Sequence, residues 1–316
     1  MDIDVSKAKY RFDKIDSSTD NFFFSRALES VRTKVYQVQY PTLQGRSFVP
    51  VNNDVDTGAE ELTVAVYDIS GDVEVTSDYS TKGPRADARS REAKYKIRGL
   101  KASYGYSLQE ARAAVLASKN RGAGQDLPMQ KAKAARENIE RKLDELIFFG
   151  SKIAGFTGLT NNPEVPSVAV AGAWAAATPL ALVADLQNIL NTPANTTNSV
   201  ENANTMLIAD TLYRFLTQKL IPNTSTTVLN WFLATNPNVR VLPSWRLNTS
   251  GPSGAPQIIA YDLNPDKLEA LIPQEFEQLA PETEGFEFVT QCHARSGGTP
   301  IHYPKSVVYA TGMGTV

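Results

Sequence analysis

The fold is decided by the stretch Met129-Gln-Lys-Ala-Lys-Ala-Ala-Arg-Glu-Asn-Ile-Glu-Arg-Lys-Leu-Asp-Glu-Leu-Ile-Phe-Phe149 and by the Gly155-Phe-Thr-Gly-Leu159 that follows it. The apolar residues of the first segment recur at steps of three, four and seven, which predicts a helix with one apolar stripe against a sheet. These residues are Met129, Ala132, Ile139, Leu143, Leu146 and Ile147. At 1.5 Å per residue the helix would be about 30 Å long.

The ends and the polar side of this helix follow from the same stretch. Pro128 and Gly150 stand where helices begin and end. The charged residues between them alternate in sign, and we expect Glu137 to Arg141 and Glu140 to Asp144 to be neighbours on the solvated side. The segment therefore serves an architectural purpose.

Composition excludes several classes of protein. The chain has 316 residues, 42% of them hydrophobic, which is enough for a sizeable core. Its net charge of -2 argues against a protein that wraps DNA by neutralising phosphates, so any nucleic acid nearby is enclosed or ignored. The single cysteine, Cys292, rules out an internal disulfide and fits a reducing compartment. Two histidines, His293 and His302, cannot supply a three-histidine metal site.

No segment predicts export or a membrane span. The N-terminus, Met-Asp-Ile-Asp-Val, lacks the pattern of a secretory signal, so we expect a cytosolic protein at synthesis. The most apolar window, Val168 to Ala184, is rich in alanine and interrupted by Thr178-Pro179. It falls short of the ~20 strongly apolar residues that a span requires. We interpret it as a loop that enters a helix.

The first half of the chain contains two segments with few local contacts. Residues 1–45 form an extended arm with Phe22-Phe23-Phe24, which either packs on another part of the chain or another subunit, or forms a local aromatic cluster. Leu62 to Tyr79 alternates with period two around Ser70-Gly71-Asp72, which predicts a β-hairpin that needs outside support. Lys82 to Arg98 holds seven basic and two acidic residues, either a solvated edge or a surface that pairs with a neighbouring subunit.

Further elements follow from shorter patterns. Ser107-Leu-Gln-Glu110 is a capping box that opens a helix to about Ser118, and Gly122-Ala-Gly124 then forms a hinge. Asp210 is expected to cap a helix that runs through Leu220. The other predicted helices are Thr178–Leu190 and Val228–Leu233, and the predicted strands are Tyr95–Tyr106, Thr205–Ala209, Val239–Leu242, Gln257–Tyr261, Leu268–Ile272, Phe286–Cys292 and Ser306–Ala310, with a flexible segment at Asn248–Gly254.

No catalytic constellation is visible in the sequence. Cys292 and His293 are adjacent, and adjacent residues of a strand point to opposite faces, which suits a nucleophile and base poorly. Arg295-Ser-Gly-Gly298 is interpreted as a tight strand connection, with an anion-binding turn as the alternative. Sequence motifs for phosphate, dinucleotide or zinc binding are missing as well. We therefore assign no catalytic, cofactor-binding or metal-ligating residue and expect no cofactor.

Two blocks of sequence resemble a known family. The first is Ala135-Arg136 to Phe149-Gly150 with Gly155-Phe-Thr-Gly158-Leu, and the second is Ile272-Pro273 to Pro281, Gly285-Phe-Glu-Phe288-Val289, Ala294-Arg295-Ser-Gly-Gly298 and Tyr303-Pro304. In order and spacing they resemble the major capsid proteins of tailed double-stranded DNA bacteriophages, with the Hong Kong 97-type fold that encapsulins share. The resemblance extends from about residue 30 to the end of the chain.

The resemblance implies an α+β fold with five parts. These are an N-terminal arm (1–45), an E-loop hairpin with P-domain strands (46–106), P-domain helices including the spine helix (107–159), an A-domain with a central sheet and flanking helices (160–285), and C-terminal strands that return to the P-domain (286–316). In that family the arm and E-loop lie across neighbouring subunits. Subunits form pentamers and hexamers of an icosahedral shell that encloses the genome.

The same resemblance sets expectations for partners and alternatives. The chain is expected to bind copies of itself, a portal, and in some systems scaffolding or decoration proteins, to enclose DNA without sequence-specific binding, and to bind no membrane. It would assemble in the host cytoplasm and reside in the virion, with no enzymatic activity. The short arm implies a separate scaffold or none, and intersubunit crosslinking is not expected. The alternatives are an encapsulin-type compartment with protein cargo and an enzyme that uses Cys292 and His293.

Overall fold

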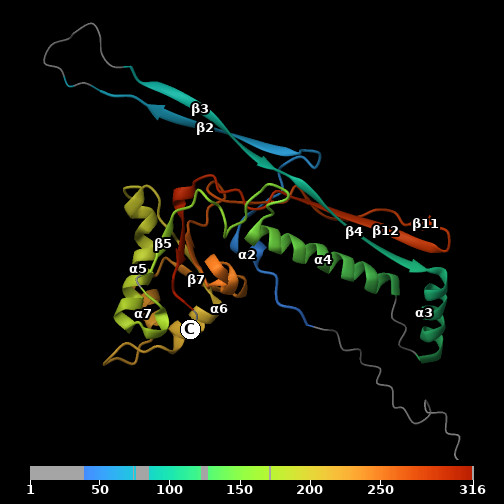
Figure 1. Cartoon of the computed structure of the whole chain (residues 1–316). Helices are drawn as coiled ribbons and strands as arrows, with labels where there is room; N and C mark the ends of the chain where they lie inside the picture. The colour runs from blue at the N-terminus through green and yellow to red at the C-terminus, as the bar shows by residue number, and fades with distance from the viewer. Residues whose placement is uncertain (1–38, 74, 76–84, 122–126, 171, 315–316) are drawn as a thin grey trace, which may run out of the picture. The chain divides into compact units, whose positions relative to one another are not determined.

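The computed structural model describes residues 39–73, 75, 85–121, 127–170 and 172–314 (Figure 1). The chain divides into two compact units, residues 1–41 and residues 42–316. Only Gln39, Tyr40 and Pro41 of the first unit are described, so most of the predicted arm, including Phe22-Phe23-Phe24, lies outside the described residues. The described helices and strands all belong to the second unit.

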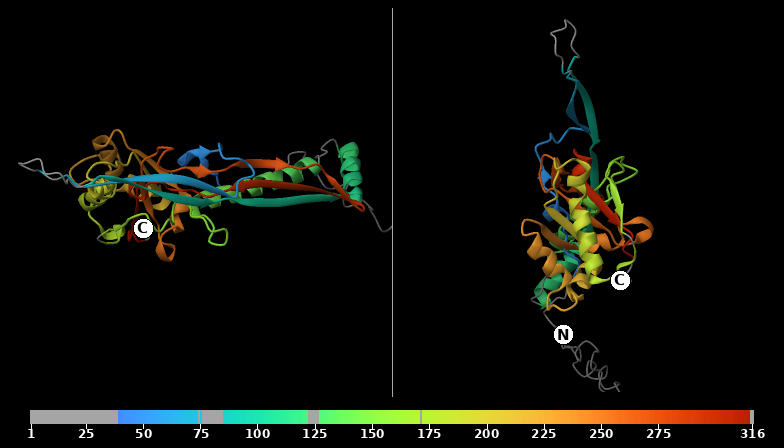
Figure 2. Two further views of the ribbon diagram at one scale, coloured as in Figure 1. Left: turned by 90° about the horizontal axis from the view of Figure 1, so that it is seen from above. Right: turned by 90° about the vertical axis from the view of Figure 1, so that its left-hand side faces the viewer.

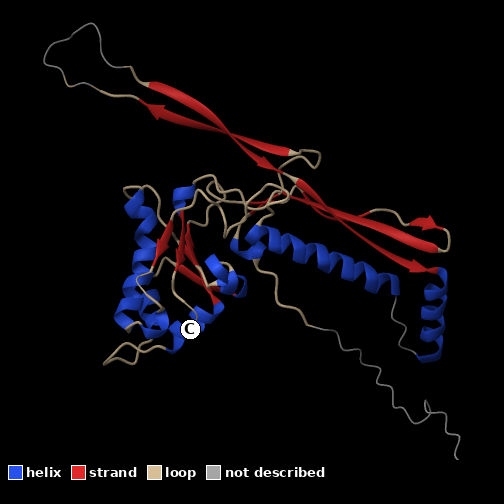
Figure 3. Ribbon diagram, in the orientation of Figure 1, coloured by secondary structure: helices blue, strands red, loops and turns tan. Residues whose placement is uncertain are grey.

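Two long antiparallel strand pairs follow each other along the chain (Figure 3). β2 (Glu61–Ser70) pairs with β3 (Asp87–Lys96), and after the buried Ile97 the chain continues as β4 (Arg98–Ser107). β4 pairs over its whole length with β12 (Glu287–Ser296). β12 also pairs with β10 (Gln274–Gln278) and β11 (Glu282–Glu284), which completes a four-stranded sheet.

This pairing corrects the predicted hairpin. The prediction turned the chain at Ser70-Gly71-Asp72 within residues 62–79, but the partner of β2 is β3. Most of the basic run at residues 82–98 is thus the return strand, and it faces the acidic β2: Glu61 is opposite Lys96 and Asp68 opposite Arg89. Opposite charges across a strand pair stabilise the register. The predicted strand over residues 95–106 is likewise two strands, since it is broken at Ile97.

The long helix is confirmed as α4 (Leu127–Phe149), two residues longer than predicted at its start. It lies beside β4 and β12 in Figures 1 and 2. Ala135, Ile139 and Leu143 form a small buried core with Cys292 and Ala294 of β12, as the apolar stripe predicts. Met129 departs from the stripe, because its side chain is largely exposed.

The capping box is confirmed at the start of α3 (Leu108–Arg121). The Glu110 amide donates to Ser107 Oγ at 3.1 Å, and the Ser107 amide donates to Glu110 Oε2 at 3.0 Å. These reciprocal bonds satisfy two amides that a helix start leaves open. The hydrogen bonds, helped by Lys131, hold the pKa of the Glu110 carboxyl below its ordinary value. The predicted hinge at residues 122–124 lies outside the described residues.

The end of α4 is closed by the Gly-Phe-Thr-Gly-Leu segment, which folds back on it. The Leu159 amide donates to Ile147 O at 2.8 Å, and the Thr160 amide to Phe148 O at 2.9 Å. Gly150 has φ +57, a conformation that suits glycine at a helix end. A Cβ on Gly158 would lie 2.4 Å from Phe148 O, so the backbones approach too closely for any side chain there.

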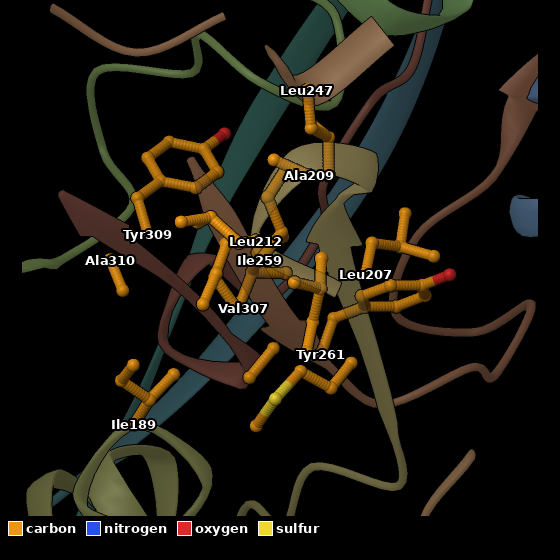
Figure 4. Packing of buried hydrophobic residues seen from close by; sticks show 14 of the residues in the cluster. Ile189, Leu207, Ala209, Leu212, Leu247, Ile259, Tyr261, Val307, Tyr309 and Ala310 are labelled. Carbon is orange, nitrogen blue, oxygen red and sulfur yellow. The ribbon is translucent and has the colours of Figure 1, made fainter. Parts of the chain in front are cut away.

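The second lobe is built on a five-stranded sheet in the order β5-β13-β8-β6-β7. Its strands are β5 (Ser167–Ala169), β13 (Val307–Thr311), β8 (Ile258–Tyr261), β6 (Thr205–Ala209) and β7 (Arg240–Ser244). β6 and β8 are buried at every position, because helices cover the sheet. The helices are α5 (Pro179–Thr196), α6 (Asp210–Gln218) and α7 (Val228–Thr235). Figure 4 shows Leu207, Ile259 and Val307 in this core.

Short elements complete the second unit. β1 (Val51–Asn52) pairs in parallel with β9 (Ala270–Leu271). The remaining short helices are α2 (Gly45–Phe48), η2 (Trp174–Ala176), η3 (Trp245–Thr249), η4 (Pro252–Gly254) and η5 (Pro304–Ser306). The apolar window at residues 168–184 thus contains η2 and the start of α5. No helix among the described residues is both long and apolar enough to cross a membrane.

The lobe differs from the sequence predictions in four respects. α5 continues to Thr196, past the predicted Leu190, with Pro193 in its last turn. Asp210 is the first residue of α6 and binds Arg214 at 2.7 Å instead of capping the helix. β13 joins the five-stranded sheet while β12 belongs to the four-stranded sheet, so the strands of the segment 286–316 are divided between the two sheets. β10 and β11 lie in the segment 160–285, which was expected to form one part with its own central sheet. They pair instead with β12 in the four-stranded sheet.

Candidate assembly surfaces

The hairpin of β2 and β3 offers contact area that the described chain leaves uncovered. Leu62, Val64 and Val66 are half-buried while the residues between them are exposed, as the period-two pattern predicts. Farther out, Tyr67 is 74% and Ile69 is 85% exposed. Among the described strands, β2 and β3 pair only with each other. The outer half of the hairpin therefore presents an apolar surface.

A buried carboxylate, Glu269, lies where the base of the hairpin meets the rest of the second unit. Its Oε2 accepts from Asn52 Nδ2 at 2.7 Å, and its Oε1 lies 3.3 Å from His302 Nε2. The His302 ring meets Tyr95 of β3 edge-on, with 5.3 Å between ring centroids. Burial opposes ionisation of Glu269, but the bonds from His302 and Asn52 outweigh it and hold its pKa below the ordinary value. Burial, reinforced by Glu164 and Glu269, raises the pKa of Tyr95.

Arg295 fixes the loop that leads into the hairpin. Its guanidinium donates to Ala59 O at 2.8 Å and also to Thr57 O. The Gly297 amide donates to Leu271 O at 2.9 Å, which ties the residue after β12 to β9. The predicted tight strand connection at Arg295-Ser-Gly-Gly298 is wrong, because Arg295 and Ser296 end β12 and the next strand, β13, begins only at Val307. The Arg295 donors bind backbone carbonyls, which does not favour the alternative of an anion-binding turn.

Asp144 joins three parts of the second unit, contrary to the prediction that it lies on the solvated side of the helix. Its side chain is 4% exposed. Oδ1 accepts from the amides of Gln44 and Gly45 at 2.8 and 2.6 Å, and Oδ2 accepts from Arg246 Nε at 3.0 Å. The carboxylate thus holds α4, residues 44–45 and η3 of the second lobe together. Nothing near Asp144 in sequence indicates this, because Arg246 is about a hundred residues away.

The far end of the four-stranded sheet carries a surface that we call the tip, made of Glu282, Glu284, Phe286 and Glu287. All four side chains are exposed, and Phe286 is 84% exposed. The Leu108 amide donates to Phe286 O at 2.9 Å, which ties the start of α3 to this turn. Of these four residues, only Phe286 and Glu287 lie in a block that carried the family resemblance, Gly285-Phe-Glu-Phe288-Val289. The acidic strand β11 was not predicted, because its three exposed residues show no apolar alternation.

Cys292 and His293 do not form a reactive pair. Cys292 is buried in the small core under α4, and burial raises the pKa of its thiol. His293 lies on the other face of β12, with its Nε2 3.8 Å from Glu277 Oε2. The described residues include no group of three or more histidine, cysteine or carboxylate side chains that could hold a metal ion. The surfaces that remain for function are those through which the protein could contact other molecules.

Solved structures share this architecture. The capsid of Myoviridae phage XM1 is 18% identical, covers 93% of this chain and 100% of its own, and superposes with a TM-score of 0.82. Mycobacterium phage Ogopogo is 12% identical, with coverage of 92% and 99% and a TM-score of 0.58. A virus-like particle from Pyrococcus furiosus is 13% identical, with coverage of 84% and 91% and a TM-score of 0.52. Among curated proteins, no relative matches the sequence.

The structure has the α+β, Hong Kong 97-type architecture that the sequence resemblance implied. The sequence model of the family described as major capsid protein matches residues 71–313, most of the chain. The chain therefore belongs to the major capsid protein family, and it is a structural component that forms the capsid of a virion. These matches do not favour the encapsulin alternative.

Proposed function

We propose that this chain assembles through pentamers and hexamers into an icosahedral head that encloses the double-stranded DNA genome of a tailed phage. The observation that carries the proposal is the hairpin of β2 and β3, whose outer half exposes Tyr67 and Ile69 and has no other strand beside it among the described residues. A two-stranded ribbon is marginally stable in water by itself. A neighbouring subunit would supply the missing cover.

Each part of the chain then has a place in the shell. Residues 1–45 would be the arm, and the hairpin of β2 and β3 the E-loop. The P-domain would comprise α3, α4 and the sheet of β4, β10, β11 and β12, and the A-domain the five-stranded sheet with β13. Each copy would bind its neighbours through several modest contacts. Closed symmetry multiplies such contacts, so they become strong collectively.

The charge of the chain suits a container for DNA. A protein that grips DNA tightly releases counterions through many lysine and arginine contacts, and it needs a basic excess for that. This chain has 32 basic and 34 acidic side chains. The shell would confine packaged DNA without sequence-specific binding and without enzymatic activity of its own. A portal, and scaffolding or decoration proteins where they are used, would complete the particle, assembled in the host cytoplasm.

The test is electron microscopy of the purified full chain across its size-exclusion profile, beside a variant without the hairpin. Glu61 and Lys96 are direct cross-strand partners, so residues 62–95 can be replaced by Asn-Gly, which closes the remaining strand ends with a two-residue turn. We expect the full chain to give closed shells or rings of five and six subunits. The variant should keep the helical circular dichroism signal and a cooperative unfolding transition, and it should stay unassembled.

A second variant tests whether assembly depends on the exposed apolar side chains of the hairpin, with the hairpin itself kept. Tyr67→Ser with Ile69→Ser removes the exposed apolar side chains and keeps the strands, so assembly should weaken. Thr63→Ser, exposed on the same face, is the matched control and should assemble like the unmodified chain. Shells of normal yield and shape from the chain without its hairpin would contradict the proposal.

A further inference from the structure

The tip is electrostatically unfavourable in an isolated subunit. Glu284 of β11 and Glu287 of β12 are direct partners across the antiparallel pair, and like charges in that position destabilise a sheet. Glu282 lies two residues before Glu284, on the same face of the strand. Among the described residues none of these three carboxylates has an ion pair, and the nearby Lys131 binds Gly105 O and Glu110 instead. Within the part of the chain that the structure describes, the tip therefore lacks a cationic partner.

Phe286 adds a second uncovered feature at the same turn. Its side chain is 84% exposed and stands between Glu284 and Glu287 in the sequence. An exposed aromatic side chain surrounded by charge resembles the centre of a protein interface, where an apolar anchor is ringed by polar groups. A partner for the tip must thus offer positive charge together with apolar surface.

Such a surface exists at the base of the hairpin, and we call it the root patch: Lys94, Lys96, Arg98, Lys152 and Ile153, all exposed. Lys96 lies against the loop after α4, because a Cβ on Gly155 would be 3.3 Å from its Nζ. Ile153 in that loop is fully exposed. Two carboxylates, Glu61 and Glu92, lie on the same face of the hairpin as Lys94 and Lys96. The four basic side chains outnumber them, so the patch stays positive.

The tip and the root patch are at opposite ends of one strand pair. Arg98 is opposite Ser296 at the root, and Ser107 is opposite Glu287 at the tip. Nine residue steps of a β-strand span about 30 Å, so the two surfaces of one copy cannot touch each other. Two different surfaces that fit each other make a head-to-tail contact, which closes into rings when the rotation between copies allows it.

We propose that the tip of one copy docks on the root patch of a neighbouring copy, with Phe286 against Ile153 and the three glutamates against the lysines. This contact rests on the proposed shell-forming function and names two surfaces that serve it. Because charges at the rim of an interface mainly set association rate and salt dependence, the contact also makes assembly sensitive to ionic strength.

The test exchanges the charges of the two surfaces in the full chain. The tip variant carries Glu282→Lys, Glu284→Lys and Glu287→Lys, and the patch variant carries Lys94→Glu, Arg98→Glu and Lys152→Glu. Lys96 is kept, because it is opposite Glu61 in the hairpin. The combined variant carries all six substitutions. Charge-keeping controls carry aspartate at the three tip positions, or arginine at Lys94 and Lys152 together with lysine at Arg98. The protein concentration needed for assembly is measured by light scattering, under the conditions in which the unmodified chain assembles, and circular dichroism checks folding.

We expect each single-surface variant to raise the assembly concentration about tenfold or more, because like charges then face each other. The combined variant should restore assembly to within a few-fold of the unmodified chain, and both controls should assemble normally. Phe286→Ser should weaken assembly in the original and in the combined chain. Normal assembly of either single-surface variant, or no recovery in the combined variant, would overturn the tip-to-root contact. Failure of the unmodified chain to assemble would instead count against the proposed function.

Discussion

Asp144 and Arg246 are 102 residues apart in the sequence and form a buried ion pair, with 2.9 Å between Asp144 Oδ2 and Arg246 Nη2. Arg246 also stacks over the Trp245 ring, 4.3 Å from its centroid, and Trp245 Nε1 donates to Thr42 O. The pair therefore fixes the spine helix, the second lobe and residues 42–45 relative to one another.

Removing the charge of Asp144 should destabilise the protein strongly. Asp144→Asn leaves Arg246 buried without its counter-charge, and loss of one partner of a buried pair costs about 3–5 kcal/mol. Urea unfolding of the unassembled chain measures the effect. Glu137→Gln on the same helix is the control, because its 3.8 Å pair with Lys133 is exposed and contributes at most about 1 kcal/mol. Equal unfolding midpoints for the two variants would contradict the assigned role of Asp144.

Gly158→Ala should prevent normal folding at the end of α4. The added Cβ would lie 2.4 Å from Phe148 O and 2.5 Å from the Gly150 amide nitrogen, and backbone atoms cannot move aside as a flexible side chain does. We expect little soluble protein, or a melting temperature lowered by several degrees, in thermal unfolding. Gly172→Ala is the matched control, since a Cβ there meets nothing within 4 Å.

Acid should weaken the contacts of Glu269 with His302 and Asn52. Because the pKa of Glu269 is lowered in the folded protein, its ionised form contributes stability that is fully present above the ordinary value of 4.5. That contribution is lost as the pH falls from 4.5 through the folded pKa. The unmodified chain should thus exceed Glu269→Gln in stability at pH 6, and the difference should shrink below pH 4.5. A difference that stays constant from pH 6 to pH 3 would contradict this.

Cys292 should react slowly with thiol reagents in the folded protein. It is 1% exposed, and burial raises the pKa of its thiol, so little thiolate is present and access is blocked. Labelling with a chromogenic disulfide should be at least about a hundredfold slower in buffer than in guanidinium, where the chain is unfolded. Fast labelling in buffer would reopen the possibility of a reactive thiol.

Sequence patterns identified the elements whose signals are local. The period of the spine helix, the reciprocal bonds of Ser107 and Glu110, and the apolar run of β6 each depend on residues close together in the chain. The partner of β2 was placed wrongly because Ser70-Gly71-Asp72 resembles a turn, whereas the true return strand begins at Asp87. Strands that pair across so long a connecting segment leave no turn motif in the sequence that would identify them as partners.

The functional surfaces were predictable only in part. The need of the hairpin for outside support followed from its length, and the exposure of Tyr67 and Ile69 agrees with it. The ionic role of Asp144 could not be foreseen, since helix periodicity places it on the polar side and its partner is distant. The tip was not predicted, because a strand of exposed polar residues has the sequence pattern of a loop. Each of these depends on contacts between residues far apart in the chain.

The closure at the end of α4 also has a mechanical meaning. The backbone of residues 147–150 meets that of residues 157–160, and Thr299 joins both: its amide donates to Thr157 O at 3.1 Å and its Oγ1 to Ile147 O at 2.8 Å. These hydrogen bonds join backbone atoms to each other or to the short Thr299 hydroxyl. None of them depends on a long, flexible side chain. If a capsid wall were stretched, the force would pass from α4 to the strands through this junction. We expect the glycine junction to be rigid and the two-stranded hairpin of β2 and β3 to bend.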